Sequence, residues 1–281
     1  MQIQQLRNAT LVLTLGAHRL LVDPMLSKPA AMPGFRVRGG PRRRNPLVPL
    51  PPEAGAALDE VTDVLITHEH PDHFDKAGLR WIAKRGLPVW ASPVDAPNLR
   101  RKGLDVHELS DGALGMRVEI IRSRHGRGAV GWLMGPVCGY YLAHPEEPSV
   151  YLIGDSVLTP SVLDAIERLQ PDVVVAPAGA ANMGLGGDIL FSVDELVILT
   201  RAAHGVVVLN HLEALDHCPT TRTGLASRME AEGLRARVRI PDDGERLTFE
   251  RPVAFTRPEP RTSGARPPGL QKWVTSLFAG T

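Results

Sequence analysis

One hexapeptide constrains this chain more than any other feature. Residues 68–73 read HEHPDH, so three imidazoles and two carboxylates lie within six positions. The apolar run at residues 61–66, directly before them, predicts a buried strand. Side chains two apart on an extended chain point the same way, so His68 and His70 should project from the strand end to one side. Pro71 keeps His70 extended and then turns the chain.

The last two residues of the hexapeptide complete the set of donors. From the turn, Asp72 and His73 can face the same cavity as the two preceding histidines. Imidazole nitrogens and carboxylate oxygens are ligands that a divalent metal such as zinc accepts. Four donors within six residues serve two ions better than one. A polar loop that is merely rich in histidine is the alternative, but the preceding strand and the following helix favour a metal site.

The order His-x-His-x-Asp-His after a strand resembles the signature of the metallo-β-lactamase superfamily. That resemblance implies an α/β fold of the αββα type, a four-layer sandwich. Two sheets pack face to face, helices cover both outer faces, and the metal site lies at one edge.

The resemblance also implies ligands at three later strand ends, and the chain has a candidate at each. His125 follows a predicted strand at 116–121, Asp155 follows one at 150–153, and His211 follows one at 205–209. The implied assignment is one metal on His68, His70 and His125, a second on Asp72, His73 and His211, and Asp155 as the bridge between them.

Simpler roles remain open for these residues. His125 lies among arginines and glycines and could be a surface histidine, and Asp155 could cap a turn. His211 competes with His217, although its position directly after a strand favours His211. His217 could instead support the ligands or act on substrate.

Two more residues are placed near the site. Asp23 resembles a family aspartate that orients the histidine loop from behind the ligands, and its alternative is a simple Asp-Pro turn. Cys218 lies farther from the strand end and is interpreted as structural.

Periodicity and capping signals predict a mixed α/β order. Further strands are expected at 10–15, 19–22, 88–91, 140–143, 172–176, 237–240 and 246–250. Helices are expected after Asp75, after Thr159, from 192 to about 203, and over 220–232. Residues 25–52 lack periodicity and form a long loop, which often covers a site. Five arginines within 36–44 could contact an anionic substrate or simply face solvent.

The expected organisation is one hydrolase domain over 1–250 and a C-terminal tail over 251–281. The tail is rich in proline and arginine up to about residue 268, which indicates a linker. Residues 270–278 are compatible with a short amphipathic helix. That helix could dock on the domain or on a second subunit of a homo-oligomer, or it could fray.

Composition narrows the classes of partner and the cellular location to be expected for this protein. The formal net charge of +1 argues against nucleic acid. Two cysteines are too few for a disulfide framework. No apolar stretch is long enough for stable membrane insertion, and the first residues lack a signal-peptide pattern. A cytoplasmic protein acting on a small molecule is expected.

The superfamily resemblance, with the ligand set that it implies, points to hydrolysis with two divalent ions, zinc first, with manganese or iron open. A hydroxide that bridges the metals would attack carbon or phosphorus. Asp72 would orient that nucleophile and pass its proton to the leaving group, with His217 or Glu213 assisting.

Residues 7–11 and 21–26 resemble the branch that contains L-ascorbate-6-phosphate lactonase. That branch implies a small ester or lactone as substrate, with or without a phosphate group. The alternatives are a phosphodiesterase and a non-catalytic metal-binding module of the same fold.

Overall fold

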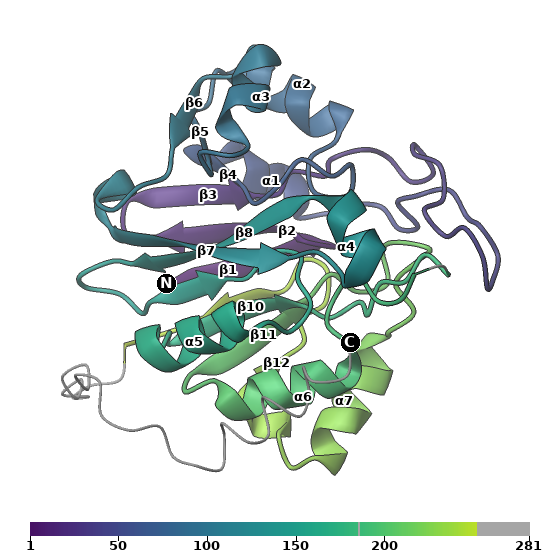
Figure 1. Ribbon diagram of the computed structural model, residues 1–281. Helices are drawn as coiled ribbons and strands as arrows, with labels where there is room; N and C mark the ends of the chain where they lie inside the picture. The colour runs from purple at the N-terminus through teal and green to yellow at the C-terminus, as the bar shows by residue number, and fades with distance from the viewer. Residues whose placement is uncertain (185, 252–281) are drawn as a thin grey trace. The chain divides into compact units, whose positions relative to one another are not determined.

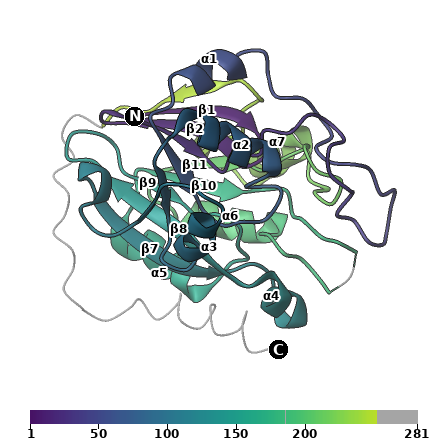
Figure 2. The ribbon, with the colours of Figure 1, turned by 90° about the horizontal axis from the view of Figure 1, so that it is seen from above.

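The computed structural model describes residues 1–184 and 186–251. Two sheets pack face to face, and helices cover the outer face of each (Figure 1). In the view from above, α2 and α3 lie in front of the strands (Figure 2). The expected αββα sandwich is confirmed.

The connections between elements are mostly short; the long ones are the segment between β3 and α1 that contains the loop at 25–52, then 178–192 and 211–221. The strands are β1 Gln2–Arg7, β2 Thr10–Leu15, β3 His18–Val22, β4 Asp63–Ile66, β5 Val89–Ala91, β6 Val106–Glu108, β7 Arg117–Arg124, β8 Pro136–Ala143, β9 Val150–Leu152, β10 Val173–Pro177, β11 Val206–Asn210, β12 Val238–Arg239 and β13 Arg246–Thr248. The helices are α1 Ala54–Asp59, α2 Lys76–Arg85, α3 Ala96–Arg101, α4 Gly128–Met134, α5 Pro160–Leu169, α6 Val193–Ala202 and α7 Arg222–Ala231.

Each sheet mixes antiparallel and parallel pairing. The first sheet has the order β13-β1-β2-β3-β4-β5-β6, and its strands run parallel from β3 to β6. The second has the order β12-β11-β10-β9-β8-β7, and β9 to β12 are parallel. Parallel neighbours end at the same edge of a sheet, so each sheet gathers several strand ends at one edge.

Alternation along the strands produces the layers. Leu11 and Leu13 of β2 point inward and pack against the second sheet, whereas Val12 points outward to the helices α1 to α3. The second sheet packs its other face against α5, α6 and α7. A strand buried on both faces reads as a continuous apolar run, as β10 and β11 do.

The helix starts follow the expected capping residues. The side chains of Asp75, Thr159 and Ser192 each accept a hydrogen bond from the first turn of α2, α5 and α6. At Ser192 the reciprocal bond from Glu195 completes a capping box. These three predictions are confirmed.

Several elements were not predicted from the sequence. α1 and α3 have six residues and α4 has seven, too few for a clear 3.6-residue period. β6 is a three-residue strand. β1 carries buried polar side chains, among them Gln4, Gln5 and Arg7, which mask its strand pattern.

The short helix expected at 270–278 lies outside the described residues. In the part of the chain that the structure describes, no helix is long and apolar enough to cross a membrane.

Gly78 lets α2 approach the segment after β3, and this contact predicts a stability difference. A Cβ built on Gly78 would lie 2.0 Å from the carbonyl oxygen of Pro24, while one on Gly55 of α1 meets nothing within 4 Å. Gly78→Ala should therefore lower the free energy of unfolding by about 1–3 kcal/mol. Gly55→Ala should leave it unchanged or raise it by up to about 1 kcal/mol. Urea unfolding measures both; equal effects would contradict the close-packing account.

Candidate metal centre

The site forms where strands of both sheets end. β3 and β4 are adjacent and parallel in the first sheet, and they lead into Asp23 and the hexapeptide. In the second sheet, β7, β9 and β11 run the same way and lead into His125, Asp155 and His211. The predicted strand-end positions therefore come together at one edge of the sandwich.

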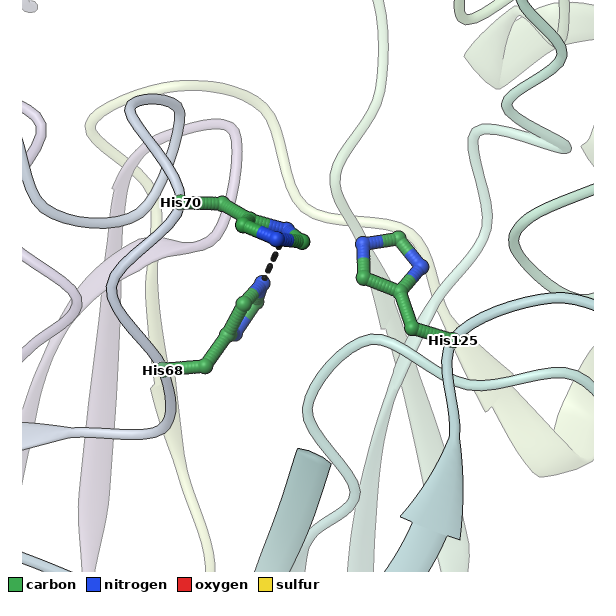
Figure 3. A group of neighbouring side chains, drawn as sticks. All are labelled: His68, His70 and His125. Atoms are coloured by element: carbon green, nitrogen blue, oxygen red, sulfur yellow. Dashed lines mark hydrogen bonds between the residues drawn. The ribbon is translucent and has the colours of Figure 1, made fainter. Parts of the chain in front are cut away.

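Three histidines form the first cluster. His68 and His70 come from the hexapeptide and His125 from the other sheet, and all three rings point toward one another (Figure 3). Nε2 of His68 and Nδ1 of His70 lie 3.1 Å apart. One ligand atom from each residue lies within 4.8 Å of the others, which is the spacing of atoms around a shared ion.

The second cluster contains two carboxylates and two histidines. Asp72, His73, Asp155 and His211 are all buried, and their ligand atoms also lie within 4.8 Å of one another. Nε2 of His73 is 3.1 Å from Oδ1 of Asp155, and Nε2 of His211 is 3.5 Å from Oδ2 of Asp72.

Asp155 lies between the clusters. Its Oδ1 faces His73 and His211, at 3.1 and 3.7 Å, while its Oδ2 is 3.3 Å from Nε2 of His125. One oxygen of this carboxylate thus faces each of the two clusters. This is the arrangement that a bridging ligand requires.

For His73 and His125, the ring nitrogen that faces away from the clusters is held by the protein. Nδ1 of His73 lies 2.7 Å from Oδ2 of Asp23, and the same carboxylate accepts hydrogen bonds from the backbone N–H and the hydroxyl of Thr67. Nδ1 of His125 donates to the carbonyl of Ile189 at 2.8 Å. Such bonds fix each ring so that Nε2 faces the cluster. The predicted supporting contact of Asp23 is present.

Two ligand-holding contacts were missed in the sequence. Thr67 Oγ1 lies 3.1 Å from Nδ1 of His68, and Cys218 Sγ lies 3.6 Å from Nδ1 of His211. Cys218, interpreted as structural, therefore touches a predicted ligand. The signal for Thr67 was its place directly before the hexapeptide. Cys218 lies seven residues after His211 in the connection between β11 and α7, and the path of that connection brings the two side chains together.

The electrostatics differ between the clusters. Burial lowers the pKa of His68 and His70, and neighbouring histidines lower it further. Burial also opposes charge on His73 and His211, but the neighbouring acidic groups together outweigh it: Asp155 and Asp23 at His73, and Asp155, Cys218 and Asp72 at His211. The pKa of both rings is raised, that of His73 to about 10. The pKa of Asp155 stays well below its usual range because His73 and His211 outweigh its burial.

The donor set fits metal ions. Nε2 of His73 and Oδ1 of Asp155 are fully buried and have no aligned hydrogen-bond partner among the described residues. Buried polar atoms without partners are costly unless a ligand satisfies them. Imidazole and carboxylate groups suit zinc and also other divalent first-row metals, so the residues fit two ions without selecting one.

The predicted assisting residues have different surroundings. His217 is buried, its ring packs edge-on against Phe35, and burial lowers its pKa. Its catalytic role stays a prediction. Both carboxylate oxygens of Glu213 bind Arg222, one to the backbone N–H and one to the guanidinium, so Glu213 is engaged in a structural ion pair.

The loop at 25–52 is anchored beside the site by Asp216. This carboxylate accepts hydrogen bonds from the backbone N–H groups of Phe35, Arg36 and Arg43 and from the side chain of Asn45. The loop lies on the same side of the molecule as α4 (Figures 1 and 2). It has a defined conformation held by the residue next to His217.

The comparisons with known proteins agree with this geometry. The family model described as a β-lactamase superfamily domain matches residues 18–212. The chain belongs to the metallo-β-lactamase superfamily. It is 31% identical over 254 residues to the UPF0173 protein YddR of Bacillus subtilis, covering 89% of this chain and all of the relative, which also places it in the UPF0173 family. The superfamily resemblance seen in the hexapeptide is confirmed.

Two solved structures are similar across the same extent. An isothiocyanate hydrolase from Delia radicum gut bacteria has a TM-score of 0.82 at 30% identity, covering 89% of this chain and 100% of that one. A possible metal-dependent hydrolase from Veillonella parvula has a TM-score of 0.82 at 28% identity, covering 89% and 99%. These similarities place the chain in the family without singling out the lactonase branch.

Replacing the central carboxylate should affect metal binding. Asp155→Ala removes oxygens that face both clusters, so we expect the variant to lose at least one ion and to bind the other at least about tenfold more weakly. The matched control is Asp164→Ala. Asp164 is an exposed aspartate of α5 that pairs with Arg168, so this variant should keep the wild-type metal content. Mass spectrometry of bound metal measures both. Two ions in Asp155→Ala with full activity would contradict the bridging role.

Metal binding should release protons from the second cluster. Because the pKa of His73 is raised to about 10 and that of His211 is also raised, both rings carry protons at neutral pH before metal binds. Metal must displace those protons, so affinity should increase as pH rises from 6 to 8, by about tenfold per unit for each proton. Calorimetry in buffers of different ionisation enthalpy counts the protons that metal binding releases. A metal affinity that does not change with pH would argue against protonated His73 and His211.

Proposed function

We propose that this protein is a metal-dependent hydrolase that uses two ions to activate water against a small ester or lactone. The observation that carries the proposal is the pair of buried clusters sharing Asp155. Bound divalent metals lower the pKa of water toward neutrality and polarise the attacked oxygen. Two solved structures of at least 28% identity, described as hydrolases, support the same class.

The chain's own residues position the reactants. Asp155, held by histidines on both sides, sets the spacing of the two clusters. The carboxylate of Asp72 stays ionised, because His211 and His73 outweigh its burial and keep its pKa far below the usual range. An ionised Asp72 can accept a proton from the attacking water and deliver it to the leaving group. His217, whose lowered pKa keeps its ring neutral, is a second candidate acceptor.

The surroundings of the site favour an uncharged substrate. The loop at 25–52, α4 and the described residues on either side of position 185, 181–184 and 186–190, meet in an apolar cluster. This cluster reaches the ligands through Cys218 and Ile189. Three of the five loop arginines bind backbone carbonyls: Arg36 to Asp216, Arg42 to Gly34, and Arg44 to Ala30 and Ala31. Guanidiniums engaged in this way support the chain, so a substrate without phosphate is the better fit.

An isothiocyanate is the second candidate substrate. It is small and uncharged, and its central carbon is electrophilic. Water added to that carbon would break the carbon–nitrogen bond, giving an amine and carbonyl sulfide. The similarity to an isothiocyanate hydrolase at 30% identity over the whole of that chain supports this candidate. The metal ligands alone fit both chemistries.

A substrate panel tests the proposal on metal-loaded protein. We expect turnover of p-nitrophenyl acetate, a γ-lactone or benzyl isothiocyanate, and at least about 100-fold lower turnover in Asp72→Asn, since a positioned proton acceptor contributes about that factor or more. Asp164→Asn is the control and should match the wild type.

The outcome separates the alternatives. Faster turnover of bis-p-nitrophenyl phosphate than of every carbon substrate would favour a phosphodiesterase instead. Two bound metals with no turnover of any compound would favour a metal-binding module that has kept the fold without catalysis.

A further inference from the structure

Asn8 lies in the wall of the metal centre. It occupies the turn between β1 and β2, with its side chain and backbone buried at 1% exposure. Its backbone is left-handed, with φ of 57°, a conformation that asparagine tolerates better than most residues. The Asn8 carbonyl accepts hydrogen bonds from the backbone N–H of His211 and from the side chain of Gln5. The turn is thereby tied to a predicted ligand.

The orientation of the Asn8 amide follows from its neighbours. Its nitrogen lies 3.0 Å from the backbone carbonyl of Asp72, which only a donor can satisfy, so Nδ2 and not Oδ1 occupies that position. One N–H is used there. The same nitrogen lies 3.3 Å from Nε2 of His211, the ring atom that faces Asp72 and Asp155. The second N–H is therefore directed into the cluster.

That second N–H needs an acceptor when the site is loaded. Nε2 of His211 has one lone pair, and a nitrogen that ligates a metal has no lone pair left for a hydrogen bond. Oδ1 of Asn8 is also buried without a hydrogen-bond partner among the described residues, so the protein does not use the side chain fully. Both facts indicate that Asn8 has hydrogen-bonding groups that remain available to a bound molecule.

We infer that Asn8 is a catalytic residue whose second amide N–H donates a hydrogen bond to an oxygen of the substrate as negative charge develops on it. A rigid, desolvated donor at that position stabilises charge more than water does. The inference rests on the proposed hydrolytic function. It adds a residue from the N-terminal hairpin to a centre otherwise built from the hexapeptide and three later strand ends.

The test uses acetohydroxamate, a small oxygen-rich chelator, titrated calorimetrically into the metal-loaded full chain. Asn8→Gly keeps the left-handed backbone and removes the amide. We expect it to retain both ions and to bind acetohydroxamate about 10- to 100-fold more weakly, the effect of losing one hydrogen bond to a charged group. Gln170→Gly, at the left-handed end of α5, is the control and should bind as the wild type does.

A second variant keeps the test decisive if Asn8→Gly is unstable. Asn8→Asp preserves the shape and replaces the donor with a negative charge, so it should keep both ions and also lose acetohydroxamate affinity. Unchanged affinity in either folded variant, or loss of metal in parallel with loss of affinity, would reduce Asn8 to a structural residue and overturn the inference. Wild-type protein that binds acetohydroxamate but hydrolyses no substrate would instead overturn the proposed function.

Discussion

The burial of the Asp155 carboxylate between two groups of imidazoles is the constraint on which the rest of this structure depends. A buried charge is tolerated only when it is paired or ligates a metal. Asp155 and Asp72 are buried with four nearly inaccessible histidines and the partly exposed His70. Bound divalent cations would compensate this concentration of charged and polar groups at the end of an apolar sandwich. Strands of both sheets lead into the segments that carry these side chains.

The site depends on contacts behind the ligands as much as on the ligands. Asp23 holds the start of the hexapeptide through Thr67 and orients His73 at the same time. Because β3 and β4 are adjacent and parallel, Asp23 and Thr67 leave neighbouring strand ends and meet directly. The geometry of the sheet thus places the supporting carboxylate under the histidine loop.

Much of this could be predicted because it is local. The hexapeptide, its preceding strand and the capping residues of α2, α5 and α6 lie within a few positions of one another, where periodicity and hydrogen-bonding rules apply. The short helices α1, α3 and α4 gave no periodic signal, and β1 was hidden by polar residues that the fold buries. Their existence depends on surfaces supplied by distant parts of the chain.

The sequence by itself determined the kind of chemistry, because the spacing in the hexapeptide places four metal-type donors at one strand end. It also indicated, through a family resemblance, which later strand ends would contribute. Only the tertiary structure decided how the two sheets bring His68 and His125 together, which oxygen of Asp155 faces which cluster, and that Asn8 and Cys218 touch His211. Those contacts join residues up to about two hundred positions apart, and no local rule relates them.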